Sequence, residues 1–406
     1  MYQLLKGMRV VEGSSFVAAP SCALHLLQLG AQVIRFDHVA GGPDFNRWPL
    51  SGDGASFYWE GLNKGKKSIA IDLSKPEGRE LAVRIATAPG ENAGLFVTNY
   101  PADGFLSHAR LAARRPDIIT VRVMGWADGT TAVDYTINAA IGLPLMTGPA
   151  SLGSEPVNHV LPAWDLLTGA TAAYALLAAE RFRRDTGKGQ ELRIPLGDVA
   201  MATLGHLGQI AEVSASGADR PRMGNALYGA FGRDFVTSDG ERMMIIAITP
   251  RQWSGMLKAL GLVEAVDAIE RELGVSFAKD EGVRFTHRER LFPLIEAAVA
   301  QRAFSDLATA FEAHEMCWGP YRTVHGALRS DPRFSVENPM FRSVAHPAGT
   351  YLTPGSPVTA SGESRGAPAR APKLGEHTEE VLSAVLNLSG GEIAKLHDQG
   401  LVASPR

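Results

Sequence analysis

The sequence is poor in cysteine: 406 residues contain only Cys22 and Cys317, which form no C-x-x-C pair. This scarcity excludes a disulfide scaffold and a zinc ribbon, and it is typical of a reducing compartment, so we expect a cytoplasmic protein. Metal-binding patterns are missing as well. None of the eleven histidines lies in an H-E-x-x-H or comparable spacing, and we therefore expect no catalytic metal.

An excess of charge of one sign and long apolar runs are also absent. The formal net charge is −3, which gives no general attraction to nucleic acids or acidic membranes. The alanine-rich run after residue 165 is interrupted by Glu180 and Arg181, so it is too short to span a bilayer. The first residues lack the apolar core of a signal peptide. We expect neither nucleic acid nor a membrane among the partners.

Common nucleotide-binding and hydrolase signatures are missing too. Residues 13–16 (Gly-Ser-Ser-Phe) stand where a dinucleotide fingerprint would follow the first strand, and no G-x-S-x-G elbow is present. A standard dinucleotide site and an α/β-hydrolase are therefore disfavoured. Residues 61–68 resemble a phosphate-binding loop with an altered spacing. Lys64 and Lys66 of this turn could neutralise phosphate, but a solvated basic turn explains them equally well.

Short apolar strands alternate with helices through the first half of the chain. This alternation predicts the α/β class, with a parallel sheet and right-handed crossovers. Strands are expected at 8–12, 31–37, 94–98, 118–123 and 190–195, and helices at 20–29, 76–88, 105–115, 165–184 and 197–214.

The length indicates two domains, because 406 residues are too many for one core. Composition shifts near residues 214–219, and beyond them a hairpin is expected to turn at Asp239-Gly240. We expect residues 1–215 to form the N-terminal part of a large domain and residues 220–325 a smaller α+β domain. Residues 326–406 are expected to be a linker and a C-terminal segment.

Asp165 is the first candidate for chemistry, because a helix begins at this residue. Unpaired backbone N–H groups and the helix dipole should hold a carboxylate there in its ionised form. An ionised carboxylate in a dry cleft is a nucleophile toward an activated acyl group. The segment alone favours a simple helix cap, since aspartate is a preferred cap residue.

Asn99 and Asp134 are two further candidates in the sheet domain. Asn99 directly follows the strand expected at 94–98, and ligands bind at the carboxyl ends of strands in such sheets. A turn-forming asparagine explains the same position.

Short motifs follow one another in a fixed order along nearly the whole chain. The most specific combines Asp165 with Thr168-Gly169 and the stretch 183–190, Arg-Arg-Asp-Thr-Gly-Lys-Gly-Gln. Others lie at 5–12, 29–37, 63–73, 222–225, 317–320 and 371–378.

Together these motifs resemble the class III CoA-transferases, the family of formyl-CoA, crotonobetainyl-CoA and α-methylacyl-CoA enzymes. The resemblance implies a Rossmann-like large domain, a smaller domain, a C-terminal segment that returns to the large domain, and an interlocked homodimer. It also implies an acyl-CoA substrate and no cofactor, because coenzyme A is part of the substrate.

The resemblance gives Asp165 the role of nucleophile. Its counterpart attacks the thioester to form a mixed anhydride, the CoA thiolate then forms an aspartyl-CoA thioester, and an acceptor carboxylate reverses the sequence. Arg47 could pair with a substrate carboxylate. Arg35, Lys64 and Lys66 offer cations for the nucleotide phosphates. Positions expected to line the CoA or acyl site are Phe16, Val17, His38 (where relatives have Arg), Asn99 and Asp134.

Two departures from the family pattern limit which reaction of the family we expect. Racemases place a catalytic His before the residue that aligns with Asp134, whereas this chain has Val133, which cannot carry a proton. Formyl-type enzymes follow their Arg-x-Gly-Asn with unbroken glycines, whereas the glycines after Asn225 are scattered. A stiffer flap favours intramolecular transfer between the carboxylates of one unsaturated C5 dicarboxylic acid. Intermolecular transfer and a non-catalytic CoA-binding protein remain alternatives.

Overall fold

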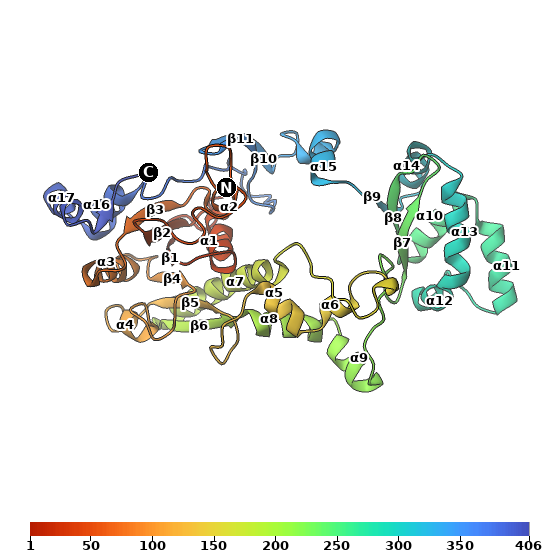
Figure 1. Ribbon diagram of the computed structural model, residues 1–406, viewed down its shortest axis with the longest axis horizontal. Coiled ribbons are helices and arrows are strands. Elements are labelled where there is room, and N and C mark those ends of the chain that lie inside the picture. The colour runs from red at the N-terminus through yellow and green to blue at the C-terminus, as the bar shows by residue number, and fades with distance from the viewer. Residues whose placement is uncertain (406) are drawn as a thin grey trace. The chain divides into compact units, whose positions relative to one another are not determined.

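The computed structural model describes residues 1–405, which fold into two compact units (Figure 1). Among the described residues, the larger unit contains 1–141, 159–216 and 332–405, and the smaller unit contains 142–158 and 217–331. The segment 142–158 was expected in the large domain. It joins the smaller unit because Arg222 donates hydrogen bonds to backbone carbonyls of this segment, among them that of Gly153 at 3.1 Å.

A seven-stranded sheet forms the centre of the larger unit, with strand order β12-β3-β2-β1-β4-β5-β6. Every neighbouring pair is parallel except β12 and β3. The predicted α/β class is thereby confirmed. The strands are β1 (Arg9–Gly13), β2 (Gln32–His38), β3 (Lys67–Ile71), β4 (Leu95–Thr98), β5 (Ile119–Met124), β6 (Gln190–Pro195) and β12 (Val402–Ala403).

Helices cover both faces of this sheet (Figure 1). On one face, α3, α4, α16 and α17 pack on strand residues in a continuous apolar core that includes Phe36, Ile69 and Phe96. The helices of this unit are α1 (Ala18–Gln28), α2 (Phe57–Asn63), α3 (Pro76–Ala86), α4 (His108–Ala112), α5 (Asp134–Ala140), α7 (Ala163–Thr186), α8 (Leu196–His206), α9 (Gln209–Ser216), α16 (Thr378–Leu386) and α17 (Gly390–Asp398); β10 (Phe341–His346) and β11 (Gly349–Pro354) form a separate hairpin.

The long helix α7 packs against α1, and Gly169 is the point of closest approach. A Cβ atom built at this glycine would lie 1.9 Å from Ser21 Oγ and 2.7 Å from the Ala18 carbonyl oxygen. Only glycine fits there, because real Cβ atoms do not approach other atoms so closely. The glycine of the Thr-Gly pair after Asp165 is therefore a packing requirement that lets α7 lie close to α1.

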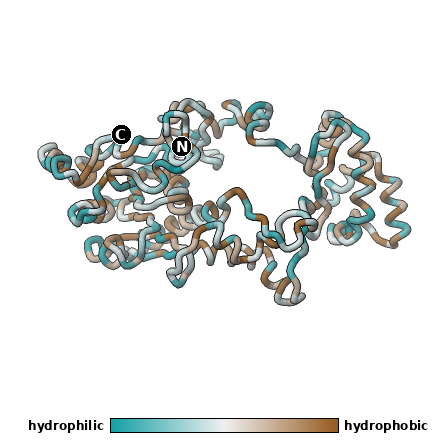
Figure 2. The backbone as a smooth tube through the Cα atoms, viewed as in Figure 1, coloured by the Kyte–Doolittle hydropathy of each residue, from teal (hydrophilic) through white to brown (hydrophobic). Residues whose placement is uncertain are grey.

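The smaller unit is an α+β structure in which helices pack on a three-stranded antiparallel sheet of order β7-β8-β9. Strands β7 and β8 form a hairpin that turns at Asp239-Gly240. Its core is rich in aromatic side chains, and its helices alternate hydrophobic and hydrophilic residues (Figure 2). Its elements are α6 (Leu143–Met146), η1 (Ala150–Leu152), β7 (Phe231–Val236), β8 (Arg242–Ala247), α10 (Pro250–Leu260), α11 (Val263–Leu273), α12 (Glu281–Thr286), α13 (Arg288–Ala300), α14 (Phe304–Ala313), β9 (Cys317–Pro320) and α15 (Val324–Ser330).

In the described part of the chain, residues 1–405, every helix is too short or too polar to cross a membrane.

Candidate active site

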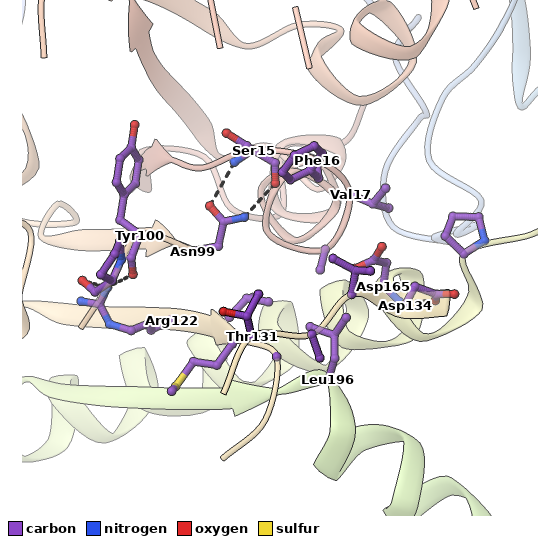
Figure 3. Close-up of a pocket in the computed structure, with 18 of the residues that line it drawn as sticks. Ser15, Phe16, Val17, Asn99, Tyr100, Arg122, Thr131, Asp134, Asp165 and Leu196 are labelled. Carbon is purple, nitrogen blue, oxygen red and sulfur yellow. Dashed lines mark hydrogen bonds between the residues drawn. The ribbon is translucent and has the colours of Figure 1, made fainter. Parts of the chain in front are cut away.

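A cavity of about 810 Å³ opens at the carboxyl ends of β1, β4 and β5 in the larger unit (Figure 3). Carboxyl ends of parallel strands meet at one edge of a sheet, so the segments that follow these strands converge there. The cavity brings Asp165 together with five other residues that were expected at the site. The five are Phe16, Val17, Arg47, Asn99 and Asp134.

Asp165 is the third residue of α7 and reaches the cavity from the first turn of that helix. The residue before the helix is Pro162, whose side chain forms no capping hydrogen bond with the first turn. The alternative in which Asp165 is a simple cap is therefore wrong. Its carboxyl group is partly buried and remains available for chemistry.

The cap of α7 comes from Asp134, the first residue of α5. Asp134 Oδ2 accepts hydrogen bonds from the backbone N–H of Trp164 at 2.7 Å and of Asp165 at 3.1 Å. Its Oδ1 lies 2.6 Å from Nε2 of His159. Only 2% of the Asp134 side chain is exposed, so it is a buried carboxylate with a full set of donors. Sequence reasoning placed Asp134 near the site but missed this capping role.

The surroundings of Asp165 change its acidity. Burial and the charge of Asp134 raise the pKa of Asp165 to about 7, while the Arg47 guanidinium acts in the opposite direction. We expected the helix start to favour the ionised form of Asp165, and the shift of its pKa is instead upward, although a substantial part is still ionised near neutral pH. The backbone donors that would have stabilised the Asp165 carboxylate are used by Asp134.

Arg47 lines the cavity with its guanidinium between two aromatic rings. Its Cζ atom lies 5.4 Å from the centre of the Phe16 ring and 5.2 Å from that of Tyr58. Such stacking orients a guanidinium and leaves its edge donors free. Within residues 1–405, no carboxylate lies within salt-bridge distance of Arg47. The site therefore holds an oriented cation that can accept an anionic group of a ligand.

Tyr58, on α2, also lines the cavity and was missed from the sequence. Its hydroxyl is buried and has no hydrogen-bond partner within the described chain. Burial raises its pKa to about 12. No motif marks this tyrosine, because its importance depends on α2 meeting the loop that carries Arg47.

Asn99 holds the loop between β1 and α1 (Figure 3). Its Oδ1 accepts the backbone N–H of Ser15 at 3.1 Å, and its Nδ2 donates to the Ser15 carbonyl at 2.9 Å. The next residue, Phe16, has φ +69°, a left-handed conformation that is unfavourable for a bulky side chain. The Asn99 clamp thus maintains a strained loop at the wall of the cavity, which goes beyond the turn-forming role considered for it.

A buried arginine that sequence reasoning missed supports the loop after β4. Arg122 donates to the carbonyls of Tyr100 at 2.6 Å and Leu106 at 2.9 Å, and pairs with Glu191 at 2.8 Å. It is 1% exposed. Arg122 therefore shapes the cavity wall, and its guanidinium is fully used in doing so.

Arg35 was expected to bind nucleotide phosphates, and the structure contradicts this. Its side chain is 1% exposed, and it pairs with Glu12 at 3.0 Å, Asp37 at 2.8 Å and Asp44 at 3.0 Å. Asn63 accepts a further hydrogen bond at 3.2 Å. Three buried carboxylates already neutralise this cation, so it has no donor left for a ligand.

Lys66 and Lys64 of the basic turn are corrected for the same reason. Lys66 Nζ lies 2.7 Å from Glu12 Oε2, with both side chains fully buried. Lys64 Nζ donates to the Gly61 carbonyl at 2.6 Å, and burial lowers its pKa to about 8. These two cations of the turn that resembled a phosphate-binding loop therefore point inward.

His38 ends β2 and lies outside the lining of the cavity. Its Nε2 is 3.3 Å from Asp72 Oδ1, and its Nδ1 accepts the N–H of Ala40 at 3.1 Å. The structure therefore does not bring it to Asp165.

Comparisons with known proteins agree along the whole chain. The family model described as CoA-transferase family III matches residues 5–378. The chain is 51% identical to a 2-methylfumaryl-CoA isomerase of Chloroflexus aurantiacus, over 100% of this chain and 99% of the relative. It is 27% identical to a mouse succinyl-CoA:glutarate CoA-transferase, over 98% and 90%. A crystal structure of a CAIB/BAIF family protein from Brucella suis superposes with a TM-score of 0.76 at 26% identity, covering 95% of this chain and 100% of that one.

Proposed function

Because the chain belongs to CoA-transferase family III, we propose that it moves coenzyme A between the two carboxylates of 2-methylfumarate (mesaconate), from C1 to C4. The observation that carries this proposal is the 51% identity, over the whole chain, to a 2-methylfumaryl-CoA isomerase. The family membership itself makes the chain an enzyme of CoA transfer, and the substrate and the route are what we propose.

The first half of the reaction makes use of Asp165. Its carboxylate oxygen attacks the carbonyl carbon of the C1 thioester, the C–S bond breaks, and a mixed anhydride and CoA thiolate result. The thiolate then attacks the aspartyl carbonyl of the anhydride, which releases free 2-methylfumarate and leaves Asp165 as a CoA thioester. Dividing the exchange in this way retains the energy of the thioester.

The second half reverses these steps at the other end of the acid. The C4 carboxylate attacks the aspartyl-CoA thioester and expels the thiolate, and the thiolate attacks the C4 carbonyl of the new anhydride. Asp165 is regenerated as a carboxylate. Neither an electron nor a proton is gained or lost, so the reaction needs no cofactor beyond the coenzyme A of the substrate.

The raised pKa of Asp165 supports the role of nucleophile. A carboxylate with a pKa of about 7 is more basic than an ordinary aspartate and is still substantially ionised near neutral pH. Greater basicity makes an oxygen nucleophile stronger, provided that it is deprotonated. Burial and the nearby Asp134 supply the basicity, and a pKa of about 7 leaves about half of the Asp165 carboxyl groups ionised at pH 7.

Arg47 supports the dicarboxylic nature of the acid. Its guanidinium is oriented by Phe16 and Tyr58 and lines the same cavity as Asp165. A carboxylate bound there would form a charge-assisted pair while the other end of the acid reacts at Asp165. An acid kept in the cavity also avoids the entropy cost of capturing a second substrate.

The proposed active form is a homodimer. The larger unit carries five large apolar side chains on or next to α7, α8 and α9 that are between 41% and 65% exposed. Exposed apolar side chains are enriched at subunit interfaces, and we place the interface at these residues. Its members are Tyr174 (64% exposed), Phe182 (47%), Met201 (41%), Leu207 (65%) and Ile210 (51%).

Two measurements test the function. Mass spectrometry of the intact enzyme after rapid quenching with 2-methylfumaryl-CoA should find a CoA or acyl adduct, and peptide mapping should place it on Asp165. Asp165→Asn should lose both the adduct and turnover. Turnover by this variant at the wild-type rate would contradict the role of Asp165 as nucleophile. A wild-type protein that binds the thioester but shows neither turnover nor an adduct would favour a CoA-binding protein.

The route is tested with labelled free 2-methylfumarate added during turnover. Intramolecular transfer predicts C4-CoA product that carries almost no label. Substantial incorporation of label would instead support transfer between an acyl-CoA and a free acid, the reaction named for the succinyl-CoA:glutarate relatives.

A further inference from the structure

His159 is joined to the nucleophile through one intermediate side chain. Its Nε2 lies 2.6 Å from Asp134 Oδ1, while Asp134 Oδ2 accepts the N–H of Asp165 itself at 3.1 Å. Figure 3 shows Asp134 and Asp165 side by side at the start of α7. His159 therefore lies two hydrogen bonds away from the residue that forms the proposed covalent bond, although it does not line the cavity.

Aromatic side chains fix the imidazole of His159. Its ring centre is 5.6 Å from that of Tyr135 at an interplanar angle of 70°, and 6.3 Å from that of Trp164 at 47°. The Tyr135 hydroxyl donates to the carbonyl of Val160, the next residue along the chain, at 3.3 Å. Since a quarter of the side chain remains exposed, neither burial nor core packing explains the placement of this histidine.

The direction of the hydrogen bond follows from the other partners of Asp134. An ionised carboxylate accepts only, so Nε2 of His159 must carry the proton of this bond. Donors on opposite sides fix the orientation of the Asp134 carboxylate: two N–H groups of α7 on one oxygen, and His159 on the other. Without His159, the carboxylate could rotate, and the first turn of α7 would lose the side-chain cap that Asp134 provides.

We propose that His159 is a positioning residue for the transfer reaction. It locks Asp134 across the start of α7, and through Asp134 it sets both the place and the charge environment of Asp165. This inference rests on the proposed role of Asp165 as nucleophile. The titratable groups that face His159 or act on Asp165 are Asp134 and Tyr135 of α5, Asp165 of α7, and Arg47.

Three substitutions separate this role from packing alone. His159→Gln keeps an N–H donor near the Nε2 position, His159→Met keeps the length but has no donor, and His159→Asn has a donor too short to reach. We expect Met and Asn to lower kcat 10- to 100-fold with KM changed less than threefold, and Gln to stay within about fivefold of the wild type.

The acid limb of the kcat profile should move to higher pH in the Met variant, because the Asp134 carboxylate loses a hydrogen-bond donor. His325→Met, at an exposed histidine of α15, is the control.

A double-mutant cycle with Asp134→Asn is the decisive measurement. If His159 acts through Asp134, adding His159→Met to Asp134→Asn should cause no further loss of kcat. Should the variants be too slow to assay, the same cycle can be measured on the free energy of unfolding. Multiplicative losses, equal losses in Gln and Met, or an unchanged kcat in Met would each overturn the proposal. Failure of the nucleophile itself is recognised separately, by the absence of an adduct on Asp165 in the wild type.

Discussion

At the scale of single residues, the start of α7 holds two carboxylates in unequal surroundings. Asp134 accepts hydrogen bonds from two backbone N–H groups and one imidazole N–H. Asp165, in contrast, is partly buried and lies beside the negative charge of Asp134. The protein therefore stabilises the charge of one and destabilises that of the other. This inequality leads to predictions on stability and on pH dependence.

Asp165→Asn should increase stability at neutral pH. The folded-state pKa of about 7 lies above the unfolded value of 3.8, so ionisation opposes folding. Well below the unfolded-state pKa of 3.8, both states are protonated and ionisation costs nothing. The cost grows between pH 4 and 7 and is complete above pH 7. The variant should gain about 2–4 kcal/mol at pH 8 and less than about 1 kcal/mol at pH 4. Denaturant unfolding at both pH values checks this, with the exposed Asp219→Asn as control; a gain that is equal at both pH values would refute the linkage.

Ionisation of Asp165, which lowers stability, should raise the activity. Asp165 attacks only as a carboxylate, so kcat/KM should rise with pH and level off above an apparent pKa near 7. A profile measured with 2-methylfumaryl-CoA from pH 5 to 9 tests this. An acid limb near pH 4 would mean that Asp165 is an ordinary carboxylate in the free enzyme.

Arg47→Met should weaken binding of the dicarboxylic substrate while sparing the nucleophile. Loss of a charge-assisted pair corresponds to about 1.5–3 kcal/mol, or roughly 10- to 100-fold in kcat/KM for 2-methylfumaryl-CoA. The acid limb should also shift to higher pH, because Arg47 lowers the pKa of Asp165. Crotonyl-CoA, which lacks the second carboxylate, serves as the comparison substrate for adduct formation on Asp165, and the exposed Arg329→Met is the matched variant. Equal losses with both thioesters would contradict a carboxylate-binding role.

At the scale of elements, the position of Asp165 depends on how closely α7 approaches α1. Gly169→Ala would place a Cβ 2.7 Å from a backbone oxygen of α1, and we expect it to destabilise the protein by about 1–3 kcal/mol and to lower kcat. Gly205→Ala in α8 is the control, since its Cβ would meet only Ile210 at 3.6 Å and a helix gains from alanine. Thermal unfolding and kcat of both variants decide the point. A Gly169→Ala variant as stable and as active as Gly205→Ala would show that the helices can separate without consequence.

The sheet and the cavity edge could be predicted at this scale because their signals are local. Alternating strands and helices, and Asn99 directly after a strand, are visible in short windows of sequence. The burial and the ion-pair partners of Arg35 and Lys66 could not be predicted in this way. Arg35 and Lys66 look like exposed phosphate ligands until Glu12, on the neighbouring strand β1, is brought against both of them. The capping of α7 by Asp134 across 31 residues is hidden for the same reason.

At the scale of the whole molecule, the exposed apolar side chains on and next to α7, α8 and α9 are where we place the interface of the proposed homodimer. Leu207 and Ile210 are 65% and 51% exposed, and a face of this kind on a free monomer would favour association. Because α7 also carries Asp165, a subunit contact along this helix would couple assembly to the geometry of the site. The dimer is thus expected to matter for activity as well as for solubility.

The double variant Leu207→Glu/Ile210→Glu should therefore shift the protein from dimer to monomer and reduce kcat more than KM. Two buried charges in an apolar interface cost several kcal/mol, enough to raise the dissociation constant by orders of magnitude. Sedimentation velocity over a range of protein concentrations measures the assembly, and the exposed pair Val336→Glu/Val358→Glu is the control for added charge. If the Leu207→Glu/Ile210→Glu variant remains a dimer, the subunits meet elsewhere. If it becomes a monomer with full activity, the cavity of one chain is complete by itself, and the coupling through α7 does not exist.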